Sequence, residues 1–292
     1  MITFFQAIVI GLIQGVTELF PISSLGHSVL LTDLFGWHNL VNSQSSSESF
    51  FLAFLVILHV ATALALLVFY WREWVKIIKG FFKSISKRRI NEPYEKLAWL
   101  IVLASIPVGL VGLIFEHSLR EIFAKPTAAA IFLVINGFIL LAGESKRRNM
   151  HDRSDFSLDS TAKNTSKIGP GRAVLVGSSQ IAALFAGISR SGITMVSGLF
   201  SGLDYEDAAR FSFLLATPII LAAGLYKLPD FMGHLGDGAR PQILAGGLAA
   251  GIAAYLSVRF LDKYFKSKSL LPFAIYCLAF GGFMIIFQAV RG

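Results

Sequence analysis

Charged residues and cysteine are both scarce in this chain, and each shortage narrows its class. Only 15% of the 292 residues are charged, whereas 54% are hydrophobic and the mean hydropathy is +0.65. That balance is typical of integral membrane proteins and not of soluble globular ones. The single cysteine, Cys277, excludes an internal disulfide and lies in an apolar run, where we expect its thiol to pack. No polar stretch is long enough for a second domain, so residues 1–292 should form one membrane domain.

Basic residues are absent from residues 1–34, although a cleaved signal peptide would begin with them. We therefore expect this segment to be retained. The net charge of +8 would suggest a nucleic-acid partner in a soluble protein. Here the basic residues lie in short loops between apolar runs, as the positive-inside rule requires. The expected surroundings are a bilayer, and no nucleic acid is expected as a partner.

Six apolar runs are long enough to cross a bilayer, which takes roughly 20 helical residues. They cover residues 50–71, 97–115, 127–143, 211–227, 242–258 and 270–289. Two further hydrophobic segments, 1–34 and 173–202, are interrupted by helix breakers. The sequence thus predicts an all-α polytopic protein in which each half has one broken re-entrant hairpin and three spans. Because three is odd, the two halves should have inverted topology.

The predicted halves are joined by a polar segment. Repeat 1 covers about 1–143, a cytoplasmic linker covers 144–172, and repeat 2 covers about 173–292. The linker is rich in serine and charged residues, and disorder is its expected state. The basic loops 72–96 and 259–269 should also face the cytoplasm, whereas 36–48, which has no lysine or arginine, should face outward.

The first broken segment carries polar side chains that are rare in apolar runs. They are Gln14, Glu18, Ser23, Ser24 and His27. Gln14 and Glu18 share one helix face, and Pro21 ends that helix. A serine can then cap a second helix whose first turn holds His27. Ionisable groups at membrane depth are functional candidates by default.

The second broken segment repeats this plan about 166 residues later. Residues 180–194 superimpose on 14–28 with four identities, namely Gln14 on Gln180, Ile22 on Ile188, Ser23 on Ser189 and Gly26 on Gly192. The helix breaker Pro21 falls on Gly187. A charge, Arg190, again lies in an apolar run. If the halves are inverted, the two polar turns should meet near the midplane, with Glu18 and His27 facing Arg190.

These motifs resemble those of the undecaprenyl-diphosphate phosphatases, the bacitracin-resistance (BacA/UppP) family. The resemblance rests on PISSLGH at 21–27, GISRSGIT at 187–194 and FSFLLATP at 211–218, and it covers essentially the whole chain. It implies that Glu18, Ser24, His27 and Arg190 are required. It also implies dependence on a divalent metal.

The chain departs from the family pattern at three positions. Leu25 replaces a threonine that many members carry, Ala186 replaces a proline, and Gln14 replaces a glutamate, although glutamine is an accepted variant there. The first change removes a hydroxyl, and the second leaves the second turn dependent on Gly187. None removes a main catalytic candidate, but together they could alter metal affinity or rate.

An arginine between two hydroxyl residues at a helix N-terminus, as Arg190 is between Ser189 and Ser191, is suited to bind phosphate. Guanidinium is a planar fork of donors, and the helix end adds N–H groups and positive potential. The expected phosphate-binding residues are Arg190, Ser189, Ser191, Thr194 and Ser23. The alternative is that Arg190 only pairs with Glu18 and holds the halves together.

His27, Ser24 and Glu18 are the catalytic candidates. Histidine can attack phosphorus directly or transfer protons for serine or water, and the sequence does not separate these routes. A structural role for His27 is the alternative. His59 has two interpretations: it belongs to the outer part of the site, or it bonds to Thr62 or a neighbouring carbonyl.

Glu18 and Gln14 are the expected metal ligands. Their oxygens suit a hard divalent cation such as Mg²⁺ or Ca²⁺. A hydrogen bond between helices is the equally weighted alternative for Gln14.

The resemblance and the motifs together predict a phosphatase in the bacterial plasma membrane. It would hydrolyse undecaprenyl diphosphate to the monophosphate and inorganic phosphate, with the site opening outward. The product would be recycled as the carrier lipid for cell-wall synthesis, and loss of the diphosphate would deprive bacitracin of its target. The alternative is a transporter or flippase of a phosphorylated lipid or solute, since broken helices in inverted repeats are typical of carriers. A homodimer is a further expectation.

The inverted topology generates a first test. Single cysteines placed at Ser45 and at Ser166, in a Cys277→Ser background, should react with a membrane-impermeant reagent from opposite sides of the membrane. The reason is that 36–48 has no basic residue, whereas 144–172 has seven. Labelling of both positions from the same side of intact cells would contradict the inversion.

Overall fold

The computed structural model describes residues 2–37, 40, 50–115, 125–149, 165, 168–232 and 239–291. Throughout these ranges the regular structure is helical. The helices are α1 (Phe4–Thr17), α2 (Ser24–Leu34), α4 (Phe50–Phe69), α5 (Trp71–Lys87), α6 (Pro93–Ile114), α8 (Pro126–Arg148), α10 (Pro170–Ser179), the 3₁₀ helix η1 (Gln180–Leu184), α11 (Arg190–Phe200), α12 (Tyr205–Met232), α13 (Arg240–Tyr264) and α14 (Leu271–Arg291). An all-α polytopic membrane protein is thus confirmed.

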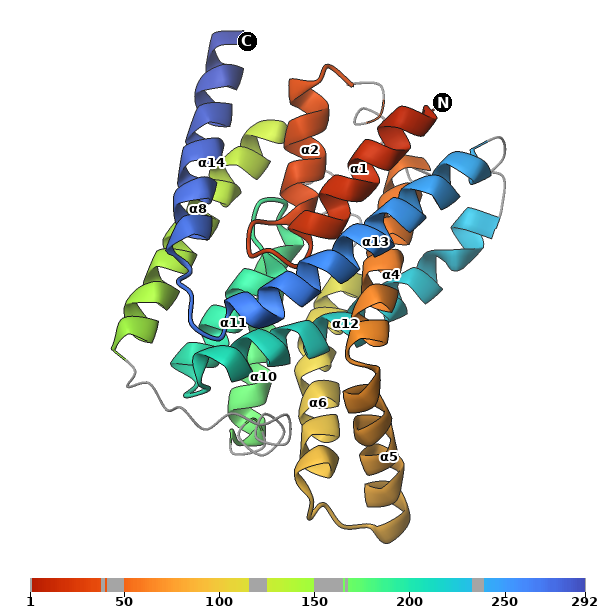
Figure 1. Cartoon of the computed structure of the whole chain (residues 1–292), viewed down its shortest axis with the longest axis vertical. Coiled ribbons are helices and arrows are strands. Elements are labelled where there is room, and N and C mark those ends of the chain that lie inside the picture. Colours follow the sequence, from red (N-terminus) through yellow and green to blue (C-terminus); the bar gives the residue numbers. More distant parts are fainter. Residues whose placement is uncertain are drawn as a thin grey trace.

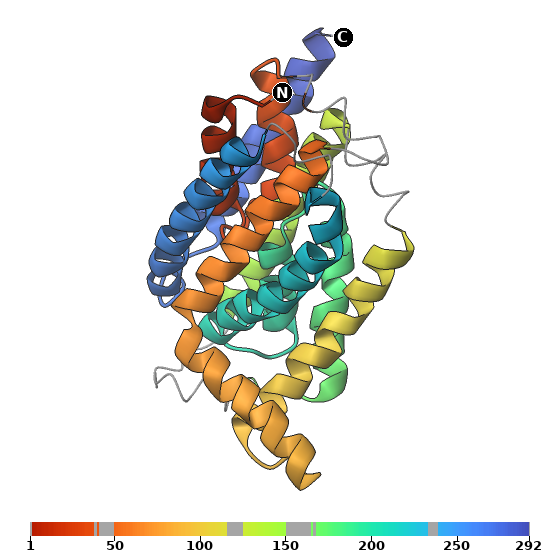
Figure 2. The same cartoon turned by 90° about the vertical axis from the view of Figure 1, so that its right-hand side faces the viewer.

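All six predicted spans are helical. In the described part of the chain, five helices are long and apolar enough to cross a membrane by themselves, namely α6, α8, α12, α13 and α14. The sixth candidate is α4, which is followed by α5 after a bend of 86°. Figure 2 shows this bend at the lower end of the molecule. The spans were therefore predicted correctly, with ends displaced by a few residues.

Two predicted boundaries were wrong. The loop expected at 72–96 contains the helix α5, which packs on α6 through the face that carries Ile77, Gly80 and Ser84. The apolar residues that recur every three or four positions on this helix, such as Val75, Ile78 and Phe82, lie on its exposed face. The linker expected from 144 begins later, because α8 continues to Arg148. Glu144 stabilises this extra turn by accepting hydrogen bonds from Arg147 at 2.9 Å and Arg148 at 3.0 Å.

The two broken segments form helical hairpins. The first hairpin is α1 and α2 with a turn at residues 18–23, and the second is α10, η1 and α11 with a turn at 185–189. In Figure 1, α1 and α2 lie above their turn, α10 and α11 lie below theirs, and the two turns lie near the middle of the molecule. This is the arrangement expected of inverted halves, and the inversion itself stays a prediction.

Each hairpin packs against the opposite half. The helix α1 lies along α13, and α10 lies along α6. Both contacts depend on glycine: a Cβ on Gly11 would collide with the backbone of Gly246, and one on Gly177 would collide with the backbone of Ala104. Gly177 stands at the repeat position of Gly11. Small residues let backbones approach closely where lipid supplies no hydrophobic driving force between helices.

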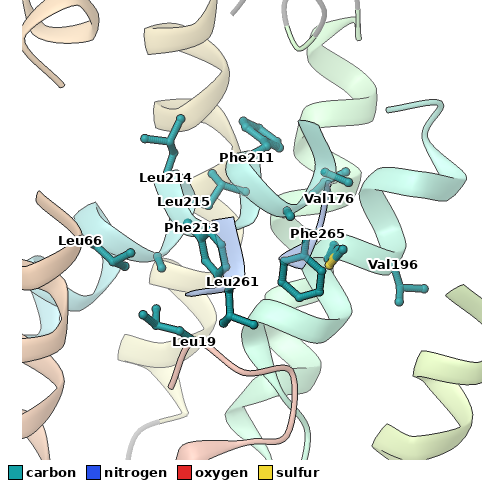
Figure 3. Packing of buried hydrophobic residues seen from close by; sticks show 14 of the residues in the cluster. Leu19, Leu66, Val176, Val196, Phe211, Phe213, Leu214, Leu215, Leu261 and Phe265 are labelled. Carbon is teal, nitrogen blue, oxygen red and sulfur yellow. The ribbon is translucent and has the colours of Figure 1, made fainter. Parts of the chain in front are cut away.

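The apolar core joins the halves behind the turns. Leu19 and Leu66 from the first half lie with Phe213, Leu261 and Phe265 from the second half, all of them buried (Figure 3). Leu19 belongs to the first turn, so the residue next to Glu18 is fixed in this core. The turn cannot shift without opening a cavity in close-packed side chains.

Candidate functional site

Both hairpins reverse direction through a capped helix start. The hydroxyl of Ser23 accepts the backbone N–H of Gly26, and the hydroxyl of Ser189 accepts that of Gly192. Both serines are thus N-caps, and that of Ser189 has the usual extended backbone. Ser23 has φ = 71°, a left-handed value that is costly for a residue with a side chain, and Gly187 has φ = 109°. The first turn is therefore strained, whereas the second uses glycine to avoid the strain.

The two turns are hydrogen-bonded to each other. The backbone N–H of Gly187 donates to the Ser23 hydroxyl at 3.1 Å. Asn136 of α8, fully buried, bridges the turns as well: its amide donates to the carbonyl of Pro21 at 2.9 Å and accepts the N–H of Ser189 at 2.9 Å. Residues more than 160 positions apart are thus held in one fixed geometry.

Glu18 lies at the centre of this junction. It is 7% exposed and accepts hydrogen bonds or ion-pair contacts from four helices. The donors are Gln14 (2.9 Å), His59 (3.2 Å), Ser24 and Arg190. Burying a carboxylate costs several kcal/mol unless it is paired and hydrogen-bonded, roughly 3–5 kcal/mol when a partner is lost. The four donors supply the ion pair and the hydrogen bonds that the buried carboxylate needs.

A cavity of about 260 Å³ opens beside Glu18. Its polar wall consists of Glu18, Ser23, Ser24, His59, Gln180, Ser189 and Arg190. The remaining wall is apolar and comes from α2, α4, α6, η1 and α12. The N-termini of α2 and α11 both reach this cavity, because Ser24 and Arg190 are their first residues. Two helix N-termini and a guanidinium favour an anion.

The structure brings five of the predicted site residues together. Glu18, Ser23, Ser24, Ser189 and Arg190 all line the cavity. Arg190 is held from behind by the carbonyl of Ala216, which accepts from its guanidinium at 3.2 Å. The expected meeting of Glu18 and Arg190 across the two halves is observed.

Ser191 and Thr194 do not line the cavity. The Ser191 hydroxyl lies 3.0 Å from that of Ser189 and 3.4 Å from the carbonyl of Phe20. The Thr194 hydroxyl bonds the carbonyl of Arg190 and the hydroxyl of Ser212, both at 2.6 Å. Both side chains bond to groups of the two hairpins or of α12, so direct phosphate contact by either stays a prediction.

His27 also points away from the cavity, against the expectation that it would face Arg190. Its Nδ1 lies 2.7 Å from the carbonyl of Ser23, and its Nε2 lies 2.8 Å from the hydroxyl of Tyr276. The imidazole stacks on Tyr276 and Phe280 of α14. His27 is not part of the cavity wall, although Ser24, three residues before it, is. These contacts favour positioning of the Ser23 backbone, and a catalytic role stays a prediction.

Of the two histidines that the structure describes, His59 is the one that reaches the cavity. Its Nδ1 lies 2.7 Å from the carbonyl of Leu55 and its Nε2 lies 3.2 Å from Glu18, so both alternatives considered for it hold at once. Gln180 and Asn136 were missed as site residues. Asn136 could have been found as an amide within an apolar span, and Gln180 as the repeat partner of Gln14.

Gln14 and Glu18 do not present two oxygens to one cation. The amide nitrogen of Gln14 faces the carboxylate, and its own oxygen is buried with no hydrogen-bond partner. Within the described residues no group of three or more His, Cys, Asp or Glu side chains is arranged to hold a metal ion. Metal ligation by Glu18 and Gln14 therefore stays a prediction.

Comparison with known proteins identifies the family. The sequence model described as bacitracin resistance protein BacA matches residues 7–283. The chain belongs to the BacA family. Among similar BacA relatives are the undecaprenyl-diphosphatase of Mycolicibacterium paratuberculosis, 51% identical over 99% of both chains, and undecaprenyl-diphosphatase 2 of Frankia alni, 48% identical over 99% of both. Undecaprenyl-diphosphatase 2 of Chromobacterium violaceum is 42% identical over 98% of this chain and 99% of its own.

Two departures from the BacA pattern can now be placed. Leu25 lies on the cavity wall, so the hydroxyl that many members carry there is replaced by an apolar surface. Ala186 is buried beside Gly187, whose φ of 109° makes the bend without a proline. The second turn is therefore formed by glycine and by the hydrogen bonds that its backbone N–H groups donate to Ser23 and Asn136.

Removing the Asn136 amide should destabilise the junction of the two turns. The variant Asn136→Leu leaves the Ser189 N–H and the Pro21 carbonyl buried without partners, at a cost of about 1–3 kcal/mol for each group. We expect the free energy of unfolding to fall by about 2–6 kcal/mol. Thermal unfolding of the detergent-solubilised protein measures this. Ile135→Leu, on the exposed side of the same helix, is the control. Equal stability of the two variants would contradict the bridge.

Proposed function

We propose that this protein is a membrane-embedded phosphatase that hydrolyses undecaprenyl diphosphate to undecaprenyl phosphate and inorganic phosphate. The contact of Glu18 with both Ser24 and Arg190 in one cavity carries the proposal. A phosphate bound in this cavity would have a carboxylate, a hydroxyl and a guanidinium within reach. Membership of the BacA family and the names of the full-length relatives agree with this activity.

The terminal phosphate would bind between the N-termini of α2 and α11. Arg190 offers planar donors, and the first N–H groups of both helices have no acceptor within their own helix. Ser189 and Ser23 add hydroxyls at the same wall. Charge on the transferred phosphoryl group is spread over its oxygens in the transition state, and such fixed donors stabilise it without reorganisation.

Ser24 is the best-placed nucleophile. Its hydroxyl already donates to Glu18, which can take the proton as Ser24 attacks the terminal phosphorus. The bond from the Ser24 oxygen to phosphorus forms while the bond to the bridging oxygen breaks, and undecaprenyl phosphate leaves. Water then cleaves the phosphoserine and releases inorganic phosphate. Attack by Ser24 is favoured over attack by His27, because both ring nitrogens of His27 contact groups outside the cavity.

A divalent cation is part of the proposal, and it would arrive with the diphosphate. Magnesium is commonly held by substrate phosphates and only one or two carboxylates, which fits a cavity whose described wall contains one carboxylate, that of Glu18. When bound, the ion would neutralise part of the diphosphate charge. The side chains that hold and attack the phosphate are those named above.

The apolar wall suits a lipid substrate. Leu55 and Val56 of α4, Val108 of α6 and Ile219 of α12 line the cavity next to the polar groups. The polyprenyl chain can thus stay in hydrocarbon while its headgroup reacts. We place the enzyme in the bacterial plasma membrane with the site opening outward, where it would recycle the carrier lipid for cell-wall synthesis and lower sensitivity to bacitracin. The homodimer stays a prediction.

Phosphate release from undecaprenyl diphosphate by the purified protein in detergent tests this function. Glu18→Gln, Ser24→Ala and Arg190→Ala should each lower kcat by about 10³-fold or more, since each removes a group that acts on the reacting phosphate. EDTA should abolish release by the wild type, and added Mg²⁺ should restore it. Arg172→Ala removes an arginine outside the cavity and should leave kcat within about twofold.

The same assay separates the phosphatase from the carrier. Binding of substrate by the wild type without any release of phosphate would favour transport of a phosphorylated lipid. Wild-type rates in all three cavity variants would remove the site assignment and leave the family activity intact.

His59 should act on Glu18 through its hydrogen bond. His59→Leu removes a donor from a buried carboxylate, which should lower kcat about 10- to 100-fold. His59→Gln can still donate an N–H to Glu18 and should retain most of the activity, because the carboxylate keeps its partner. Steady-state kinetics of the two variants test this. Thermal unfolding of each variant checks that both are folded. Equal losses in both would instead indicate proton transfer by the imidazole.

A further inference from the structure

Gln180 lines the cavity beside Glu18 and has no role in the steps described above. It is the first residue of η1, directly after α10, and only 1% of it is exposed. Its amide nitrogen makes one long hydrogen bond, 3.4 Å to the carbonyl of Gly177. Its amide oxygen is buried and has no hydrogen-bond partner among the described residues. Gln180 thus brings an acceptor that lacks a donor to the cavity wall.

The other polar side chains of this wall bond to groups of the protein. They are Glu18, Ser23, Ser24, His59, Ser189 and Arg190. An amide oxygen can only accept, so the partner of Gln180 must be a donor. The oxygens of a phosphoserine are mainly acceptors at pH 7, because its second pKa is about 6. Water, the second reactant of a hydrolysis, is a donor that fits.

The fold does not depend on the Gln180 side chain. The carbonyl of Gly177 also accepts the backbone N–H of Gln180, so it keeps a partner without the amide. The position of the residue is nevertheless fixed, because α10 packs closely on α6 where a Cβ on Gly177 would collide with the backbone of Ala104. A buried amide held in place and left half unpartnered points to a ligand.

The cavity has room for a phosphoryl group and water together. Its volume is about 260 Å³, whereas one water takes up roughly 30 Å³ of the liquid. Ser24 lines it from the first hairpin, and Gln180 lines it from the second. A phosphoryl group on Ser24 would therefore share the cavity with a water bound to Gln180.

We propose that Gln180 holds the water that hydrolyses the Ser24 phosphoester. This inference rests on the proposed function and assigns a residue to its second step. One O–H of the water donates to the amide oxygen, which leaves a lone pair of the water for the phosphorus. The bond from the water oxygen to phosphorus forms, the bond from the Ser24 oxygen breaks, and Glu18 returns its proton to Ser24. Dihydrogen phosphate leaves with both protons of the water. Some GTPases orient the attacking water with a glutamine in the same way.

A metal ion is the other partner that suits an amide oxygen. At this wall it would lie near the Arg190 guanidinium and the N-termini of α2 and α11, all of which are positive. Neutral water carries no such cost. Water is therefore favoured over direct metal ligation by Gln180.

Rapid-quench kinetics of the purified protein in detergent test this, with undecaprenyl diphosphate labelled in its terminal phosphate. Gln180→Leu should lower kcat for phosphate release about 100-fold, because a misplaced reactant costs about that factor. The first turnover of undecaprenyl phosphate should stay within about threefold of the wild-type rate. Phosphate should then accumulate on Ser24, where peptide mass spectrometry detects it.

Gln14→Leu is the matched control. Gln14 is the repeat partner of Gln180, and its amide oxygen is also buried without a partner. It is not part of the cavity wall, however, and its nitrogen donates to Glu18 at 2.9 Å. Gln14→Leu should therefore slow the formation of phosphoserine, and no phosphoserine should accumulate.

Thermal unfolding separates this role from a structural one. Gln180→Leu should unfold at the wild-type temperature or above it, because the substitution removes a buried oxygen that has no partner in the described part of the protein. A lower unfolding temperature, together with equal slowing of both chemical steps, would make Gln180 a structural residue and contradict the proposal.

Three further results would overturn the proposal and leave the phosphatase function intact. The first is phosphate release by Gln180→Leu at the wild-type rate. The second is slow release of both products without phosphoserine, which would place Gln180 in the first step. The third is recovery of kcat in this variant with excess Mg²⁺, which would make Gln180 a metal ligand. A wild type that releases no phosphate would instead contradict the proposed function itself.

Discussion

A carboxylate buried at membrane depth is the constraint on which the rest of this structure depends. Glu18 is only 7% exposed, and an uncompensated charge there would cost several kcal/mol or more. Its compensation comes from α1, α2, α4 and α11 together. Gln14, Ser24 and His59 belong to the first half, whereas the cation Arg190 comes from the second, so the charge of Glu18 is balanced only when the two halves meet. The same donors leave Glu18 charged and able to accept a proton from Ser24.

The precision of the site comes from backbone hydrogen bonds between the two turns. Ser23 keeps a left-handed φ, and its hydroxyl accepts N–H groups from both turns, those of Gly26 and Gly187. Asn136 ties the same turns from a third element. Strained backbone persists where the surroundings over-determine it. Here the strain places Ser24 at the start of α2, where its hydroxyl reaches Glu18.

The sequence predicted the pairing of Glu18 with Arg190, because two polar motifs in apolar segments can be stabilised only against each other. It also predicted the six spans, since hydropathy alone decides them. It could not assign the histidines. His27 lies in a motif but faces α14, whereas His59 lies in an unmarked span and faces Glu18. Which face of a helix meets a cavity depends on its rotation, and a uniformly apolar span gives no amphipathic pattern that would fix it.

The two turns have similar frameworks and different chemistry. Both begin from a buried glutamine whose amide oxygen has no partner, and both end in a serine-capped helix. The first turn then adds Glu18 and Ser24, which can move a proton and attack phosphorus. The second adds Arg190, which can only bind. A symmetric pair of carboxylates would repel each other and a bound diphosphate, and a symmetric pair of arginines would hold the lipid without cleaving it. Hydrolysis therefore requires that the two repeats differ at these positions. The first turn supplies the base and the nucleophile, and the second turn supplies the positive charge.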